Sequence, residues 1–355
     1  MVSEKEIASV DSARSALGKG YRIVPSVNFL GLMIWFLDRV TIGWEGSWSV
    51  AGEGLGTVGM MWVEADTVWS YVLWVEVLPN SIGLILSQTR YIIDLLKKTK
   101  MLEAKPISSP MAQSTSLSAF EGDPLDDVTL YRNTIGALKY LSLTRPDISF
   151  IVNKLSQFMH CPTSLHWQSV KCHLRYLKQT IHLGLQLKRS KFNTLQAFSD
   201  VDWAGCCDDQ RSTGGFYVFL GDNLISWGCK KQKIVAQSST EAENKALANA
   251  TAKVKWLCAL LYELGTPIPR STVLWCNNIG ATYSSSNLVF HARTKHVEID
   301  FPFVSDMVVD DSHVNRFLSC WDQLADIFRK PLSSSRFTLL QSNFNILLVQ
   351  LSLQQ

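Results

Sequence analysis

The chain has 355 residues, of which 46% are hydrophobic and 18% are charged, with a formal net charge of +3. This length suggests at least two domains, and the apolar fraction suffices for packed cores, which excludes a chain that is disordered throughout. The first 79 residues hold more acids than bases, so the positive charge lies in the remainder, where it is compatible with nucleic-acid binding without demonstrating it.

Targeting signals are not expected. The first residues carry acids and no apolar core, unlike a signal peptide. The apolar run at 26–37 is shorter than the ~20 residues of a membrane span, and the run at 60–79 is interrupted by Glu64, Asp66 and Glu76. None of the eight cysteines forms a C-x-x-C pair, so we expect free thiols. We therefore expect an intracellular protein, cytoplasmic or nuclear, without a transmembrane helix.

The segment 1–80 differs from the rest of the chain. Residues 1–79 hold six of the twelve tryptophans and nine of the twenty glycines, and neither a helical nor a strand period persists in them. We assign no structure to this segment. It is either an unfamiliar small domain or a leader that does not belong to the ancestral reading frame.

Helices dominate the next part. Residues 88–102 predict an amphipathic helix with lysines near its C-terminus, and 103–127 are rich in Pro and Ser and predict an extended linker. Three further helices are expected at 130–144, 146–162 and 164–180. The third presents Lys171, His173, Arg175 and Lys178, which form either a solvated face or a face that follows phosphates.

From residue 195 the pattern becomes mixed. A strand ends on Asp200, a hairpin turns at 221–223, and a long helix ends at Gly265. A strand at 272–276, a helical start at 296–308, a strand at 313–320 and a short helix at 321–332 follow. Antiparallel strands first and parallel strands afterwards predict a mixed α/β sheet.

Acidic residues gather where strands end and helices begin in this part. Carboxylates converging on one sheet edge could hold two Mg²⁺ ions about 3.5–4 Å apart and activate a water. The same acids could equally be ordinary helix caps and dipole partners. The residues concerned are Asp200, Glu241, Glu243, Asp322 and Asp326.

Several segments resemble plant copia-type retrotransposon Pol polyproteins. Those similar to the RNase H domain are FSDVDWAG, RSTGGFYVFLGDNLISWGCKKQKIVAQSSTEAE, LWCNN, HARTKHVEID and DQLADIFRKPL. Those similar to the end of the reverse transcriptase are LSQTRYIIDLLKKTKMLEAKPISSPM, YRNTIGALKYLSLTRPDISFIVNKLSQFMH and HWQSVKCHLRYLKQTIHLGLQL. The chain thus resembles a C-terminal fragment of such a polyprotein.

The resemblance implies a fold and domain limits. We expect an RNase H-like mixed five-stranded sheet with flanking helices at 191–334. A helical remnant of the reverse-transcriptase thumb and connection is expected at 81–190, and a tail at 335–355. Residues 1–80 have no part in the resemblance.

The resemblance also implies Mg²⁺- or Mn²⁺-dependent cleavage of RNA in RNA–DNA hybrids by four carboxylates. It assigns Asp200 as the first, with Asp202 as the alternative, and Asp326 as the fourth, with Asp322 as the alternative. The second is Glu243 or Glu241. We favour Glu243, because the positions three, four, seven and eleven residues after it are apolar and form the buried helix stripe, whereas Glu241 suits a cap with Ser238.

The third carboxylate is expected after Trp-Cys, where this chain has Asn277. An amide has no charge, and Mg²⁺ prefers anionic oxygen, so we predict at least a ~100-fold loss of cleavage. Other departures agree: Pro302 falls in an expected helix, Arg329 replaces the usual Thr before Lys-Pro-Leu, and Asn244 replaces the usual Tyr.

We therefore expect a retrotransposon-derived RNase H-like protein whose nuclease activity is weak or absent. No Tyr-Val-Asp-Asp motif is present, and VVDD at 308–311 lies in a region that the family uses as a surface turn, so polymerase activity is not expected. The alternatives are a non-catalytic module that binds RNA–DNA hybrids or an inert product of a decayed element. Lys230, Lys231 and Lys233 are candidate phosphate contacts, or lysines that protect a sheet edge. The expected partner is nucleic acid, with neither a membrane nor a small-molecule substrate.

Overall fold

The computed structural model describes residues 75–111, 117–189, 194–268, 271–286, 300–309, 313–319 and 321–349. The expectations for residues 1–74, and for the last two residues of the VVDD stretch, lie outside the described residues.

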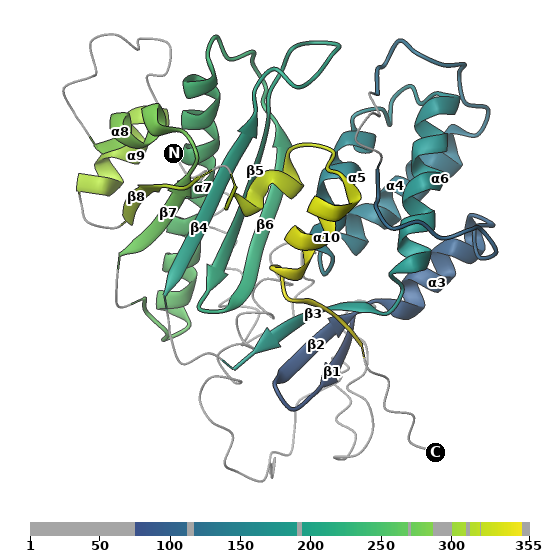
Figure 1. Cartoon of the computed structure of the whole chain (residues 1–355), viewed down its shortest axis with the longest axis horizontal. Helices are drawn as coiled ribbons and strands as arrows, with labels where there is room; N and C mark the ends of the chain where they lie inside the picture. Colours follow the sequence, from purple (N-terminus) through teal and green to yellow (C-terminus); the bar gives the residue numbers. More distant parts are fainter. Residues whose placement is uncertain are drawn as a thin grey trace, which may run out of the picture.

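The larger of two sheets has five strands in the order β6-β5-β4-β7-β8 (Figure 1). β4 pairs antiparallel with β5, and β5 with β6, whereas β4 and β7, and β7 and β8, run parallel. This arrangement confirms the predicted mixed five-stranded α/β sheet. Its strands are β4 (Leu195–Asp202), β5 (Thr213–Leu220), β6 (Asn223–Lys231), β7 (Thr272–Cys276) and β8 (His313–Phe317).

One long helix, α7 (Ser239–Glu263), covers a face of this sheet (Figure 1). Its buried stripe, which includes Leu247, Val254 and Leu257, packs with Ala197 and Leu274 of the central strands in one apolar cluster. The spacing of these residues matches the helical period, so burial of the stripe fixes which face of α7 meets the sheet.

Two shorter helices, α8 (Ile279–Ser286) and α9 (Asp300–Val309), complete this side of the domain. Pro302 is the third residue of α9 and therefore lies in its first turn, where backbone N–H groups have no partner within the helix. Proline is tolerated in a first turn, so the cost of a proline inside a helix does not arise at this position.

The helical part precedes the large sheet in the chain and lies beside its β6 edge (Figure 1). The three expected helices are present, the second of them divided into a 3-10 turn and an α-helix. The elements are α3 (Thr89–Lys98), α4 (Val128–Leu141), η1 (Pro146–Ile148), α5 (Ser149–Ser156) and α6 (Ser164–Gln179). His173, which we placed on an exposed basic face of α6, is instead fully buried.

A second, four-stranded sheet corrects the predicted limits at both ends. Its strands are β1 (Glu76–Pro79), β2 (Gly83–Ser87), β3 (Leu183–Lys188) and β9 (Ile346–Leu348), in the order β1-β2-β3-β9. The folded part thus begins before residue 81. The predicted tail contributes α10 (Ser334–Ser342) and β9, because its apolar side chains are buried.

The helical part and the large sheet share one apolar cluster. Leu96 and Leu174 of the helices, Tyr217 of the sheet and Phe344 of the C-terminal segment all belong to it. α10 lies between the sheet and the helices in Figure 1. The C-terminal segment therefore stabilises the contact between the two parts.

A buried polar network reinforces this contact. Arg145 donates to both carboxylate oxygens of Asp147, at 2.9 and 2.7 Å, and also donates to the backbone oxygen of Thr180. Tyr176 and, from α10, Gln341 donate to the same carboxylate. Because these groups come from three elements, the network fixes their mutual placement.

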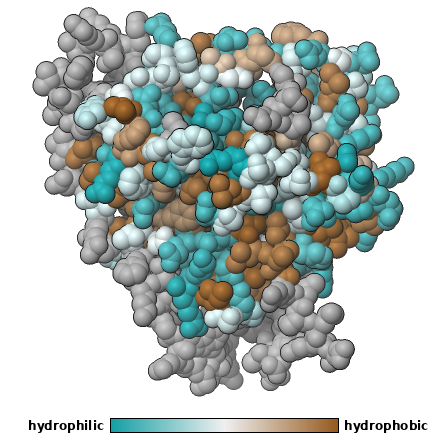
Figure 2. Space-filling model, viewed as in Figure 1, coloured by the Kyte–Doolittle hydropathy of each residue, from teal (hydrophilic) through white to brown (hydrophobic). Residues whose placement is uncertain are grey.

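The described surface mixes polar and apolar residues. Figure 2 shows apolar side chains in small groups between hydrophilic ones on the face that it presents. None of the described helices combines the length and hydrophobicity that crossing a bilayer requires. Within the same ranges the cysteines are free thiols, as predicted.

Candidate functional site

The register between two parallel strands builds the centre of the candidate site. Ser199 of β4 lies opposite Cys276 of β7, so the next residues, Asp200 and Asn277, emerge side by side at the carboxyl edge of the sheet. This edge is where α/β folds place their functional groups. Asn277 lies close enough to Asp200 to lower its pKa slightly against the larger effect of burial, and the Asp200 side chain is completely buried.

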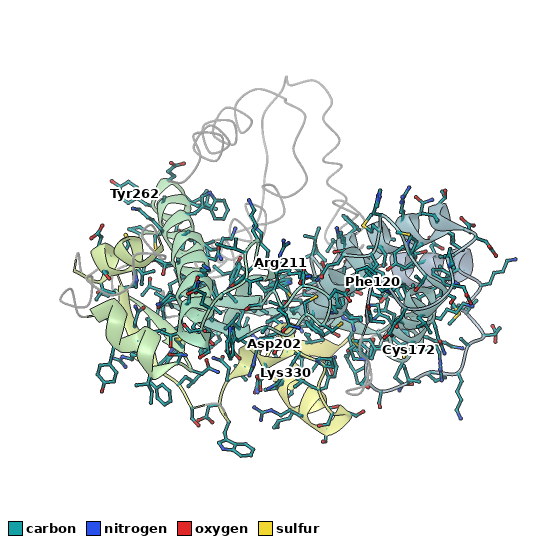
Figure 3. The ribbon with its side chains drawn as sticks, turned by 90° about the horizontal axis from the view of Figure 1, so that it is seen from above. Phe120, Cys172, Asp202, Arg211, Tyr262 and Lys330 are labelled. Carbon is teal, nitrogen blue, oxygen red and sulfur yellow. The ribbon has the colours of Figure 1, made fainter. Side chains whose placement is uncertain are left out.

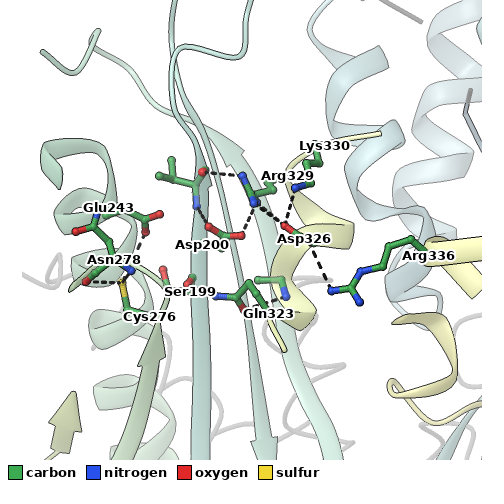
Figure 4. A network of polar contacts seen from close by, with 12 residues as sticks. Ser199, Asp200, Glu243, Cys276, Asn278, Gln323, Asp326, Arg329, Lys330 and Arg336 are labelled. Carbon is green, nitrogen blue, oxygen red and sulfur yellow. Dashed lines mark hydrogen bonds and ion pairs between the residues drawn. The ribbon is translucent and has the colours of Figure 1, made fainter. Parts of the chain in front are cut away.

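Glu243 reaches this centre from α7. It is 4% exposed, it lies close enough to Asp200 for the two carboxyl groups to interact, and the Cys276 thiol lies 3.9 Å from its Oε2 atom. Figure 4 shows Glu243, Cys276 and Asp200 on neighbouring elements. The periodicity argument thus selected the glutamate that faces the sheet.

Glu241 has a different role in the same helix. The Ser238 side chain accepts a hydrogen bond from its backbone N–H at 3.1 Å, and its carboxylate accepts from Gln237 N and pairs with Lys245. These contacts form the predicted N-terminal cap. Glu241 therefore stabilises the N-terminus of α7, and its carboxylate is paired there.

The fourth expected carboxylate lies on a short 3-10 helix, η4 (Leu324–Phe328), within the stretch where we predicted a short helix. Asp326 is 6% exposed, whereas the alternative Asp322 is exposed. A Cβ atom at Gly215 of β5 would lie 2.6 Å from Phe328 Cβ. The glycine therefore allows η4 to approach the sheet closely and brings Asp326 to the site edge.

Asp202, the alternative first carboxylate, lies two residues after Asp200 at the end of β4 and is partly buried. Burial raises the Asp202 pKa, and the charges of Arg329 and then of Lys330, which lies beside Asp202 in Figure 3, partly offset this increase. Successive residues alternate across a strand, so Asp202 can point the same way as Asp200 from a position further along.

Arg329 lies between the first and fourth expected carboxylates. Its Nε atom forms an ion pair with Asp200 Oδ2, and its Nη2 atom lies 2.6 Å from Asp326 Oδ1 (Figure 4). Lys330 Nζ is 3.1 Å from the same Asp326 oxygen. Protein cations therefore contact the oxygens that a metal ion would need.

The electrostatics of the buried acids follow from these contacts. Burial raises the pKa of Asp200, which Arg329 opposes and the charge of Asp326 reinforces. Burial, and next the charge of Asp200, raise the pKa of Glu243. At neutral pH a pKa of about 9 keeps Glu243 protonated and therefore a poor metal ligand, whereas Asp200, with a pKa of about 6, stays largely ionised.

These residues do not fit a pair of Mg²⁺ ions in this arrangement. Mg²⁺ requires oxygen ligands in near-ideal octahedral geometry, and the amide of Asn277 contributes no charge. Asp200 and Asp326 are engaged by Arg329. Across the described ranges no group of three or more His, Cys, Asp or Glu residues is arranged to hold a metal ion.

Comparison with known proteins identifies the family. No family model matches the chain. The retrovirus-related Pol polyprotein from transposon RE1 of Arabidopsis thaliana is 48% identical over 276 residues, which is 78% of this chain and 19% of that polyprotein. The one from transposon RE2 is 47% identical over 267 residues, 75% of this chain and 18% of that polyprotein. The chain belongs to the copia-type retrotransposon Pol family.

The chain spans about a fifth of the length of these two Pol polyproteins. An uncharacterised mitochondrial protein of Arabidopsis thaliana is 46% identical over 193 residues, 53% of this chain and 78% of that protein. Among solved structures, an RNase H1 in complex with RNA/DNA hybrid covers 38% of this chain and 94% of its own, with a TM-score of 0.31 and 11% identity. A foamy viral protease-reverse transcriptase in complex with RNA/DNA hybrid aligns with 72% of this chain and with 31% of its own chain, with a TM-score of 0.38 and 10% identity.

The three lysines predicted to contact phosphates in this Pol-family chain differ in their surroundings. Lys231 Nζ lies 2.8 Å from Asp209 Oδ2 and 3.0 Å from the Cys206 sulfur. Lys230 and Lys233 are exposed near the end of β6 and in the following loop. β6 is an edge strand, so protection of this edge remains a second role for them.

The sequence did not predict the residues that support and contact the expected carboxylates, namely Gln323 and Arg329. Gln323 is fully buried and donates to the Ser199 carbonyl at 3.1 Å, which ties the segment before η4 to β4. Arg329 was noted only as a departure from the family. The available signal was its positive charge three residues after Asp326. Its contact with Asp200 could not be recognised in this way, because the two residues are more than a hundred positions apart.

Proposed function

We propose that this chain is a retrotransposon-derived RNase H-like protein that binds RNA–DNA hybrids and whose metal-dependent cleavage of the RNA strand is weak or absent. The observation that carries the proposal is the position of Asn277. It follows β7, beside the buried Asp200, where the family resemblance places a carboxylate.

The chemistry of the amide supports loss of cleavage. A carboxylate can bridge two divalent cations with two anionic oxygens, whereas Asn277 offers one neutral oxygen. Removing one group that stabilises a transition state typically costs ~10²–10³ in rate. We therefore expect cleavage at least ~100-fold slower than in a variant whose site is restored.

Cleavage of a labelled RNA–DNA hybrid by the full chain tests the proposal. Wild type is compared with Asn277→Asp, alone and together with Arg329→Thr, in Mg²⁺ and in Mn²⁺, and hybrid binding is measured in parallel. Wild-type cleavage as fast as that of the fastest restored variant would contradict the proposed impairment. Absence of hybrid binding by every protein would contradict the proposed partner.

A non-catalytic hybrid-binding module is the second candidate. The exposure of Lys230 and Lys233 favours it, because phosphate contacts need charge and reach but no metal. Hybrid binding by wild type together with no cleavage by any variant would favour this candidate over an impaired nuclease.

A further inference from the structure

Arg329 is a buried cation within a cluster of acids. Its side chain is 15% exposed, and the carboxylates of Asp200 and Asp326 that it contacts are 0% and 8% exposed. These acids come from β4 and η4, which are more than a hundred residues apart in the chain. One guanidinium therefore joins two elements at the centre of the candidate site.

All three nitrogen atoms of the Arg329 guanidinium contact acceptor oxygens. Its Nε donates to Asp326 Oδ1 at 2.8 Å and also contacts Asp200, while its Nη1 donates to the Val201 carbonyl at 3.3 Å. A guanidinium keeps its charge at all ordinary pH values and presents its donors in a rigid planar fork that matches carboxylates. Figure 4 shows the fork directed at both acids.

We propose that Arg329 is the resident cation of this site: its guanidinium neutralises Asp200 and Asp326, holds η4 against β4, and excludes divalent metal ions. The proposal rests on the proposed function, because it supplies a second cause of impaired cleavage. Asn277 removes an anionic ligand, and Arg329 occupies those that remain.

The guanidinium of Arg329 and a divalent metal ion would compete for the same carboxylates, those of Asp200 and Asp326. A divalent ion bound to Asp200 and Asp326 would have to displace the guanidinium from a mostly buried position and leave it without those partners. Lys330 contacts Asp326 but forms no ion pair with Asp200 among the described residues, and its side chain is 38% exposed. Without Arg329, the two buried acids would repel each other unless another cation joined them.

Mn²⁺ binding to the full chain and its effect on the melting temperature test this proposal without any activity measurement. Wild type and Asn277→Asp should bind Mn²⁺ weakly and melt at the same temperature with and without it. Arg329→Thr should melt at a lower temperature without metal, should be stabilised by Mn²⁺, and should bind Mn²⁺ at least ~10-fold more tightly than wild type, which corresponds to about 1.4 kcal/mol.

Arg336→Thr is the matched control, because Arg336 Nη2 lies 4.0 Å from Asp326 Oδ2 but does not bridge to Asp200. It should leave Mn²⁺ binding as in wild type. Equal Mn²⁺ affinity of wild type and Arg329→Thr would overturn the proposal. Should Arg329→Thr not fold, wild type remains informative: tight Mn²⁺ binding that Asp200→Asn abolishes would overturn it as well.

The cleavage assay separates this proposal from the proposed function. We expect Asn277→Asp alone to remain slow and the double variant with Arg329→Thr to be faster. Full activity of Asn277→Asp alone would overturn the role of Arg329 but leave the impairment by Asn277 intact. Full activity of wild type would overturn the impairment, while the Mn²⁺ measurements would still decide the role of Arg329.

Discussion

The salt dependence of hybrid binding provides a sharp test of the proposed nucleic-acid contacts. Lys230 and Lys233 are exposed, and neither has an ion-pair partner within the described part of the chain. Lys231 is held by Asp209 at 2.8 Å. We therefore expect Lys230→Gln combined with Lys233→Gln to remove two phosphate contacts, and Lys231→Gln to remove none.

The magnitude follows from counterion release. Each phosphate contact contributes ~0.9 to the slope of log affinity against log salt, so the double variant should lose ~1.8 from this slope. When salt increases fourfold, the affinity of wild type should then fall about 12-fold more than that of the double variant.

Fluorescence anisotropy of a labelled RNA–DNA hybrid, titrated with the full chain at several salt concentrations, measures these slopes. Lys231→Gln serves as the matched control, because it removes a lysine from the same strand. An unchanged slope in the double variant would refute the assignment, and so would an equal loss of slope in Lys231→Gln.

Two further predictions concern the buried network. Arg145→Met should cost about 3–5 kcal/mol of unfolding free energy, because it leaves the Asp147 carboxylate buried without its cation, whereas Lys97→Met removes an exposed ion pair and should cost at most about 1 kcal/mol. Urea unfolding of the full chain measures both, and similar costs would contradict the argument. Burial lowers the pKa of His173 to about 3, against about 6.5 in an unfolded chain, so its contribution to stability is complete above pH ~6.5 and falls by about 2 kcal/mol at pH 5. His173→Phe should therefore lose less stability than wild type between pH 7 and pH 5, with the exposed His160→Phe as control, and identical acid sensitivity of all three proteins would refute a neutral buried histidine.

The sequence predicted those parts of the site that depend on local periodicity and family motifs. The apolar stripe of α7 distinguished Glu243, which faces Asp200, from Glu241, which caps the helix. The succession of strands and helices along the chain and the position of Asn277 after β7 also followed from the sequence. These features are encoded within short segments, so a single sequence suffices to recognise them.

Features that depend on distant contacts were not predicted. Whether Arg329 would point to solvent or into the site depends on how η4 packs against β4 and β5. The side chain of His173 faces the core although its neighbours in the sequence are basic. β9 is too short and irregular in pattern to be recognised without its partner β3.

The pairing of β3 with β9 has a consequence for biosynthesis. Leu183 of β3 pairs with Leu348, so the second sheet cannot be completed until about 165 more residues have been made. At ~5–20 residues per second, β3 would wait on the order of ten seconds or more on the ribosome. During that interval, the edge of β3 and the apolar surface that Phe344 later covers are exposed to other chains. We therefore expect the nascent chain to depend on chaperones more than its finished structure would suggest.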